Sequence, residues 1–435
     1  MNLQHRPMRF IEILPTLTAA VGIAAVQGFS GSRWAIGSEA SVALLVTIVA
    51  PLAAAILLRR VSPGSDLLLI SVAGMLVAIG SVTLIALSGE AGAVGEFYGA
   101  IAFRHGLFAG VGYLALLAGV LAATRVDKVI KYPFTILGIA ITLTLATVVF
   151  GSTVNGARLW LQIGAVRFQP SEVARVLIAI FVSIYLYDRR HLIAAPWRVG
   201  SMDLVFLPYL LPLLAALSGA AAVLVLQNDL GMAALVLLGG FASMVAVFTS
   251  RATLGFAIAL LGLATIGAYV TVERVRDRVA GWLNPWDDPA GRGFQFVQAD
   301  YGFAAGGVFG GGSSLVGANV PEIHTDLILV GVGNQFGWLT AVGLVSMLSL
   351  LVCRCALASL RARNRFEVML GLSLTGVIAI QSILIVGGTL RVLPLTGLTV
   401  PLASYGGSSI TVTLFTIGVI AGLRASPRRT HRLLS

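Results

Sequence analysis

Long apolar runs recur from one end of this chain to the other, and they constrain its fold more than any other feature. Only 11% of the residues are charged, against roughly 25% in ordinary soluble domains, and the mean hydropathy is +0.95. The runs approach the roughly 20 residues that an α-helix needs to cross a bilayer, whereas a transmembrane β-barrel would show alternating segments of about 10 residues. The sequence therefore predicts an all-α polytopic membrane protein.

We expect about twelve membrane-spanning helices, and the 50 glycines suit close helix packing in lipid. The region 204–248 is read as a helix pair or as one broken helix. The first run is longer than the apolar core of a signal peptide, so it is expected to be a retained helix. The predicted spans are 10–29, 41–58, 67–87, 106–123, 133–150, 173–187, 204–226, 230–248, 252–270, 325–350, 366–390 and 404–423.

The basic residues predict the orientation in the cytoplasmic membrane. An even number of spans places both termini on one side, and if that side is the cytoplasm it holds most of the 29 Lys and Arg residues. The basic balance therefore indicates topology and contact with anionic membrane lipids. Nucleic acid is not an expected partner, because no basic stretch is interleaved with aromatic residues. Cys353 and Cys355 are interpreted as inert thiols.

This topology places the longest connection, residues 271–324, on the outer side. It carries two adjacent carboxylates, Asp287 and Asp288, and its many aromatic residues argue against disorder. A plain alternative for Asp288 is a helix N-cap, with Pro289 at the first helical position. The glycine-rich stretch 306–312 lacks the Gly-Lys-Ser/Thr of a nucleotide-binding loop, so turns are the expected role.

Three more charged clusters lie at or inside the outer membrane edge, where ionisable residues usually have a function. The first contains Glu172 and Arg175, which are three residues apart on one helix face and can pair. The second is the break at Asp229, and the third precedes the tenth span and contains His324. Each cluster alone is compatible with helix caps or satisfied ion pairs. Their common side favours one shared polar cavity. The scattered histidines do not support a zinc site.

These clusters resemble, in order, the motifs of the SEDS family, the RodA/FtsW/SpoVE-like peptidoglycan glycosyltransferases, and the variation resembles that of actinobacterial members. The matching pieces are Gly156-Ala157-Arg158-Leu159-Trp160, Phe168-Gln169-Pro170-Ser171-Glu172, Asp229-Leu230-Gly231, Asn284-Pro285-Trp286-Asp287-Asp288-Pro289 with Gly291, Gly293 and Gln295, Pro321-Glu322 with His324-Thr325-Asp326, and Thr396-Gly397-Leu398-Thr399-Val400-Pro401 with Ser404-Tyr405-Gly406-Gly407-Ser408-Ser409.

The resemblance implies a ten-helix core within 61–423 that polymerises lipid II at the outer membrane face. Residues 1–60 would add two transmembrane helices, and 424–435 would form a basic cytoplasmic tail. The resemblance also implies a class B penicillin-binding protein (a transpeptidase) as partner. A divalent cation, Mg²⁺ or Mn²⁺, held by Asp288 is a second role for that residue, and no organic cofactor is expected.

The resemblance assigns the catalytic role to Asp288, as a base or electrostatic group beside the acceptor hydroxyl, with Asp287 as a modulating neighbour. Arg158, Arg175 and Arg292 are candidates to bind the pyrophosphate, because a guanidinium matches phosphate oxygens bidentately. The other candidate substrate-binding residues are Trp160, Gln169, Glu172, Asp229, Gln295, Glu322, His324, Asp326, Ser404 and Ser408.

Departures from the family pattern leave the role in elongation or division open. The family usually has Lys where Arg175 stands, and many members have Gly where Arg391 stands. Asn334-Gln335 replaces a typical Glu-Glu pair, and Ile385 replaces an Asn. Two other functions are compatible with the buried charges: a lipid II flippase that uses them as a polar path, and a non-catalytic scaffold that recruits a transpeptidase.

Overall fold

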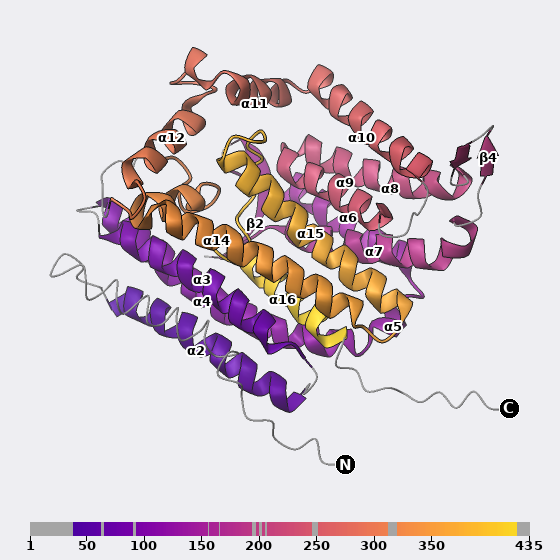
Figure 1. The fold of residues 1–435 in the computed structure, drawn as a ribbon, viewed down its shortest axis with the longest axis horizontal. Helices are drawn as coiled ribbons and strands as arrows, with labels where there is room; N and C mark the ends of the chain where they lie inside the picture. Colours follow the sequence, from indigo (N-terminus) through magenta and orange to yellow (C-terminus); the bar gives the residue numbers. More distant parts are fainter. Residues whose placement is uncertain are drawn as a thin grey trace.

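The computed structural model is predominantly helical, as predicted (Figure 1). The residues that it describes are 38–61, 65–89, 93–154, 156–164, 166–193, 197–199, 202–204, 207–245, 251–311 and 320–423. The predicted span 10–29 and the basic tail 424–435 lie outside these ranges, so the count of twelve spans stays a prediction.

Seven of the described helices are long and apolar enough to cross a membrane, or up to eight if the bent pair α10–α11 forms one span. The seven are α2 (Ser38–Val61), α3 (Leu67–Ser88), α4 (Ala93–Ala123), α6 (Pro133–Phe150), α7 (Pro170–Ile193), α14 (Ile328–Leu360) and α15 (Arg365–Thr389). Three shorter apolar helices are α8 (Leu207–Leu226), α9 (Leu230–Val245) and α16 (Gly407–Leu423). The predicted class, an all-α polytopic membrane protein, is therefore confirmed.

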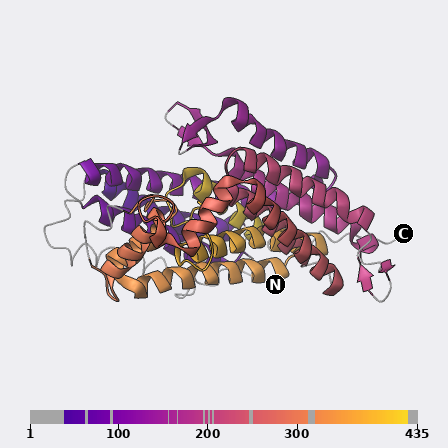
Figure 2. The same cartoon turned by 90° about the horizontal axis from the view of Figure 1, so that it is seen from above.

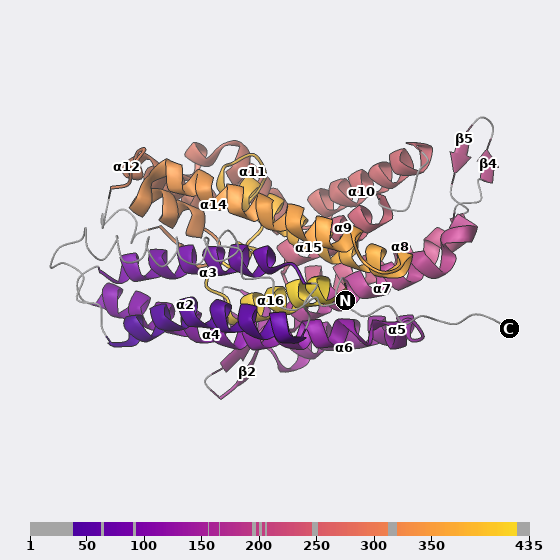
Figure 3. The ribbon, with the colours of Figure 1, turned by 60° about the horizontal axis from the view of Figure 1, so that its bottom comes forward.

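The clearest change in outline is at α4, whereas the region 204–248 forms the helix pair that was one of its two predicted alternatives. Helix α4 begins at Ala93, well before residue 106, because Arg104 and His105 interrupt the apolar run without interrupting the helix. The region 204–248 forms the separate helices α8 and α9, which meet at Asn228 in the left-handed region (φ 63°). The predicted span 41–58 corresponds to α2, which packs on α3 and α4 (Figure 3).

Close helix approach holds the centre of the bundle together. At the crossing of α4 and α16, a Cβ on Gly119 would lie 2.3 Å from the Phe415 carbonyl oxygen, and one on Gly418 would lie 2.0 Å from the Leu116 carbonyl oxygen. Larger side chains there would force the two backbones apart. This packing explains why glycine is abundant in a chain whose helices gain little from burying one apolar surface against another in lipid.

The segment 273–306, which we call the cap, covers one end of the bundle. Helix α10 (Arg251–Thr271) bends by 98° into α11 (Glu273–Leu283), and η1 (Pro285–Asp287) and α12 (Phe294–Gly306) follow. Figure 1 shows α11 and α12 above the other helices, and in Figure 2, which is seen from above, the salmon-coloured segment that contains α11 lies in front of them. The short α5 (Val126–Val129) lies at the opposite end.

Two small antiparallel sheets were not predicted. One contains β1 (Ser152–Val154), β2 (Ala157–Ile163) and β3 (Val166–Phe168), and the other pairs β4 (Trp197–Val199) with β5 (Met202–Leu204). The strand β2 alternates apolar residues with Arg158, Trp160 and Gln162. This period of two is the signal that could have revealed it.

The loop after α12 is fastened to a kink in α14. Gly337 has φ 84° inside α14, and a Cβ there would lie 2.2 Å from the Val308 carbonyl oxygen. The Trp338 amide donates to the Gly307 carbonyl, and the Gly311 amide donates to the Asn334 carbonyl. The glycine-rich stretch therefore forms tight turns, as predicted, within residues 306–311.

Candidate functional site

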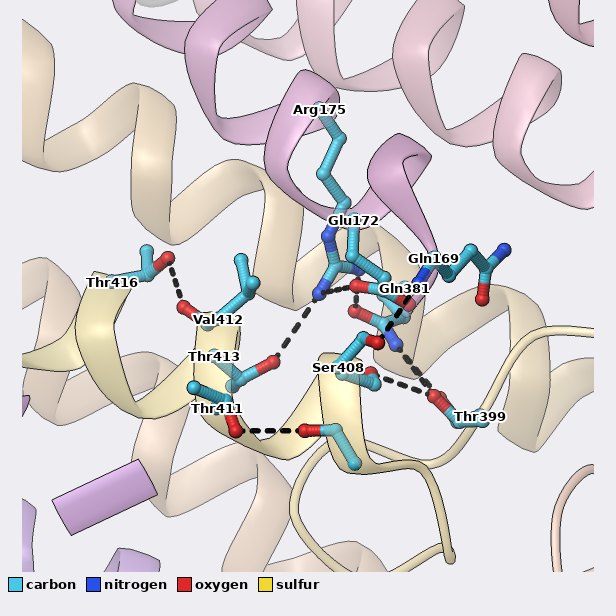
Figure 4. A network of polar contacts seen from close by, with 12 residues as sticks. Gln169, Glu172, Arg175, Gln381, Thr399, Ser408, Thr411, Val412, Thr413 and Thr416 are labelled. Carbon is cyan, nitrogen blue, oxygen red and sulfur yellow. Dashed lines mark hydrogen bonds and ion pairs between the residues drawn. The ribbon is translucent and has the colours of Figure 1, made fainter. Parts of the chain in front are cut away.

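A buried ion pair lies at the start of α7. The Glu172 and Arg175 side chains are 2.7 Å apart and almost fully buried, as their i,i+3 spacing predicted. Arg175 also donates to the side-chain oxygen of Gln381 on α15 and to Thr413 Oγ1 on α16, the latter at 3.2 Å (Figure 4). The pair therefore joins three helices in the interior of the bundle.

The segment between α15 and α16, residues 390–406, connects this pair to the outer face; we call it the connector. Gln381 Nε2 donates to the Thr399 carbonyl at 2.8 Å (Figure 4). The Thr399 and Ser409 hydroxyls are 2.9 Å apart. Ser404 Oγ accepts from the Val400 amide and donates to the Thr325 carbonyl. The connector thus lies between the buried pair and the segment before α14.

Gln169 and Asp229 extend the network toward α9. The Gln169 amide donates to Ser408 Oγ at 3.0 Å, and Gln169 Nε2 lies 3.4 Å from Asp229 Oδ2. Asp229 caps α9, because its Oδ1 accepts from the Met232 amide. Burial, with the nearby Glu172 charge, raises the pKa of Asp229 to about 6. The Asp229 carboxyl therefore loses its proton at a higher pH than an exposed aspartate does.

The segment 322–326 borders the same network. The Tyr405 amide donates to the His324 carbonyl at 2.8 Å, and the His324 ring lies among the rings of Phe97, Tyr98 and Tyr405. Burial lowers the pKa of His324 and thus favours its neutral imidazole, while the Glu322 charge opposes the shift. Thr325 Oγ1 donates to Glu322 Oε2 at 2.9 Å. The three candidate residues of this motif, Glu322, His324 and Asp326, therefore lie in one turn.

The Asp288 loop has a compact geometry of its own. Asp288 follows η1, and Pro289 does not begin a helix, so the N-cap alternative is wrong. Asp288 Oδ2 accepts from the Arg292 amide at 3.0 Å and lies 3.7 Å from Arg292 Nε. A Cβ on Gly291 would lie 2.4 Å from this carboxylate. The glycine therefore makes room for the carboxylate, which stays about half exposed at 46%.

The remaining candidates lie at the surface of the outer end. Arg158 is exposed, and its guanidinium donates to the carbonyls of Gly151 and Val148, so it caps the end of α6. Trp160 is half-buried on the same strand. Arg292 and Gln295 are exposed, and Arg292 Nη1 lies 3.7 Å from Asp277 on α11.

The structure therefore joins the predicted clusters in two groups. The first is a buried network, with Gln169, Glu172, Arg175, Asp229, Ser404 and Ser408 next to the segment 322–326. The second is the Asp288 loop with Arg292, on the cap above. Arg278, Gln381, Thr399 and Thr413 take part in the first group and were not predicted. A glutamine inside the apolar run of α15 is the signal that could have pointed to Gln381.

A metal site is a separate question. In the part of the chain that the structure describes, no group of three or more His, Cys, Asp or Glu residues is arranged to hold a metal ion. Mg²⁺ is often bound by one or two carboxylates together with substrate phosphates. The protein alone thus offers no complete cage, and a cation at Asp288 stays a prediction that would need the substrate's oxygens.

The fold and site together define a polytopic helical membrane protein whose buried polar network lies beneath a cap that carries Asp288 at one end of the bundle. A family model for FtsW, RodA and SpoVE, described as cell cycle protein, matches residues 66–429. The chain belongs to this family, as its motifs predicted.

Relatives and solved structures agree with this assignment. The chain is 32% identical over 382 residues to peptidoglycan glycosyltransferase RodA of Mycobacterium tuberculosis, which covers 86% of this chain and 81% of the relative. It is 29% identical to stage V sporulation protein E of Bacillus subtilis, over 83% of this chain and 97% of the relative. The mycobacterial relative supports the predicted resemblance to actinobacterial members.

The fold is similar to two solved structures. A chain of a peptidoglycan synthase complex, described as coordinating polymerization and crosslinking, has a TM-score of 0.66 and 27% identity, covering 83% of this chain and 97% of that one. The rod shape determining protein RodA of Thermus thermophilus has a TM-score of 0.57 and 24% identity, covering 83% and 96%. The second similarity concerns the fold alone.

Proposed function

We propose that this protein is a peptidoglycan glycosyltransferase that polymerises lipid II at the outer face of the cytoplasmic membrane. The family match and the names of its relatives support glycosyl transfer over lipid transport or a purely structural role. The observation that carries the proposal is the Asp288 loop, a half-exposed carboxylate fixed by its own backbone at the polar end of the bundle.

In the proposed reaction a hydroxyl of the acceptor sugar attacks the anomeric carbon of the donor. The new bond joins that oxygen to the carbon, the bond from the carbon to the pyrophosphate oxygen breaks, and undecaprenyl pyrophosphate leaves. Asp288 accepts the hydroxyl proton, since its carboxylate is accessible and already oriented by the Arg292 amide. A base in this position raises the nucleophilicity of the attacking oxygen.

The leaving pyrophosphate needs positive charge beside it. Arg292 is the best placed of the three predicted arginines, because its side chain is 56% exposed and its carboxylate contacts are long, at 3.7 Å. Arg158 keeps α6 capped, and Arg175 is buried in its pair. Ser171 Oγ and Arg175 Nε are buried without a hydrogen-bond partner among the described residues. Such groups suit contact with a bound polar ligand.

We also propose where the protein lies in the membrane and which partner it binds. Both termini lie in the cytoplasm, the cap lies outside, and membrane lipids surround the bundle. The partner is a class B penicillin-binding protein, and the similarity to a chain of a peptidoglycan synthase complex supports such a partner. The divalent cation, if bound at Asp288, would neutralise pyrophosphate charge.

Purified protein given lipid II should make glycan polymer, and Asp288→Asn should abolish it, because an amide cannot accept the proton. Glu273→Gln, an exposed acid on the same cap, is the control and should keep wild-type activity. Full polymerisation by Asp288→Asn would contradict the assigned role. Lipid translocation in vesicles by wild-type protein that makes no polymer would favour the flippase instead.

A further inference from the structure

Arg278, which lies on α11 of the cap, is half-buried where the cap meets the connector. Its Nη1 donates to the carbonyls of Leu395 and Thr396 at 3.2 and 2.9 Å. One guanidinium therefore satisfies two consecutive carbonyls of a segment that is more than a hundred residues away in sequence. This contact fastens α11 to the connector at Leu395 and Thr396.

Two carboxylates of the site lie near the same guanidinium. Asp326 and Asp229 both interact electrostatically with Arg278. Gly397 shows how close this arrangement is, because a Cβ there would lie 3.5 Å from Asp326 Oδ2 and 3.6 Å from Arg278 Nη2. Arg278 thus supplies positive charge where the network would otherwise hold two neighbouring acids.

Two other contacts tie the cap to the start of the connector. Trp282 Nε1, one helical turn after Arg278, donates to the Arg391 carbonyl at 2.9 Å. Asp300 on α12 pairs with the Arg391 guanidinium at 2.8 Å. The connector therefore contacts both cap helices that flank the Asp288 loop, and Arg278 is the contact nearest to the buried carboxylates.

The position of α11 determines the position of the Asp288 loop. The loop begins directly after α11, and Gly281 of α11 packs so closely on it that a Cβ would lie 2.3 Å from the Arg292 carbonyl oxygen. A shift of α11 must therefore carry Arg292 and Asp288 with it. On its other side, the connector holds Gln381, which binds Arg175.

We propose that Arg278 is a positioning residue: by holding α11 on the connector, it determines where the Asp288 carboxylate lies relative to the buried Glu172–Arg175 pair. The inference rests on the proposed glycosyl transfer for its effect on rate. Its structural part, the fastening of the loop through Arg278, can be measured without any activity.

The test uses full-length protein and compares Arg278→Gln, Arg278→Lys and the control Arg276→Gln. Arg276 is an exposed arginine on the same helix whose guanidinium donates to the Val270 carbonyl of α10, away from the connector. The initial rate of polymerisation at varied lipid II gives kcat and KM. Hydrogen exchange of the peptide 284–300 reports the loop, and exchange of α7 reports the core.

Arg278→Gln should lower kcat by about 10- to 100-fold while KM stays within about twofold, because a small displacement of a catalytic group costs rate more than binding. Exchange in 284–300 should rise, and exchange in α7 should not change. Arg278→Lys should fall between, since it keeps the charge but cannot span two carbonyls. Arg276→Gln should match wild type.

Wild-type kcat or wild-type loop exchange in Arg278→Gln would overturn the proposal, as would equal losses in Arg276→Gln. If Arg278→Gln does not fold, Arg278→Lys decides, and a wild-type kcat in that variant counts against positioning. If wild-type protein makes no polymer, the proposed function fails, whereas the exchange measurement still tests whether Arg278 holds the loop.

Discussion

Some ionisable residues at the outer end are buried, and burial disfavours their charged forms. Burial raises the pKa of Asp326 to about 7, with the Glu322 charge adding to the rise and Arg278 opposing it. Asp326 lies just before α14, outside the membrane-spanning part of that helix. A carboxyl of this kind changes its protonation state within the physiological pH range.

The raised pKa of Asp326 makes stability depend on pH. Between the unfolded value of 3.8 and the folded value of about 7, the folded state binds the proton more tightly than the unfolded state, so stability falls as pH rises. Asp326→Asn removes this contribution. Thermal unfolding of both proteins should be measured between pH 4 and pH 8. The melting temperature should fall more steeply with pH for wild type than for Asp326→Asn, by the contribution of one titrating group. Parallel curves would contradict the raised pKa.

Residue-level prediction succeeded where the signal was local. The pairing of Glu172 with Arg175 follows from their spacing on one helix. The other partners of Arg175, Gln381 and Thr413, are over 200 residues away, so only the packing of α7, α15 and α16 reveals them. The role of Arg278 could not be predicted either, because its acceptors are distant backbone carbonyls, which have no sequence signature.

At the scale of elements, hydrophobicity located the helices but not their irregularities. Helix α6 matches its predicted span, Pro133–Phe150, because a proline begins it and Gly151 follows it. The bend between α10 and α11 and the β1–β3 sheet depend on contacts between segments. One such contact is the hydrogen bond from Asn228 Nδ2 to the Gly156 carbonyl, which joins the sheet to the break between α8 and α9.

The kink in α14 gives a prediction for one element. Gly337→Ala should destabilise the protein by about 1–3 kcal/mol, because the residue needs φ 84° and its Cβ would meet the Val308 carbonyl. The loop 307–311 should then separate from α14 and become accessible to protease. Gly343→Ala on the same helix is the control, since its Cβ meets nothing within 4 Å. Equal thermal midpoints for the two variants would show that the kink is not required.

At the scale of the whole molecule, the two ends of the bundle differ in the charged residues that they carry. The cap and its acids lie at one end, and α5 with its basic neighbours lies at the other (Figure 1). The arginine-rich turn after α14, with Arg361 and Arg363, also belongs to the predicted cytoplasmic side. A bilayer retains such basic segments in the cytoplasm. A glycosyltransferase that acts on externally displayed lipid II needs the opposite end to face outward.

This orientation can be measured with single cysteines in a protein that carries Cys353→Ser and Cys355→Ser. A membrane-impermeant maleimide should label Asp287→Cys in intact cells and should label Arg361→Cys only after permeabilisation, because both positions are exposed but lie on opposite sides. The cysteine-free protein is the control for background labelling. Labelling of Arg361→Cys in intact cells would invert the bundle and place Asp288 in the cytoplasm. The outer-face reaction would then be impossible even if the buried network and the cap were correct in every contact.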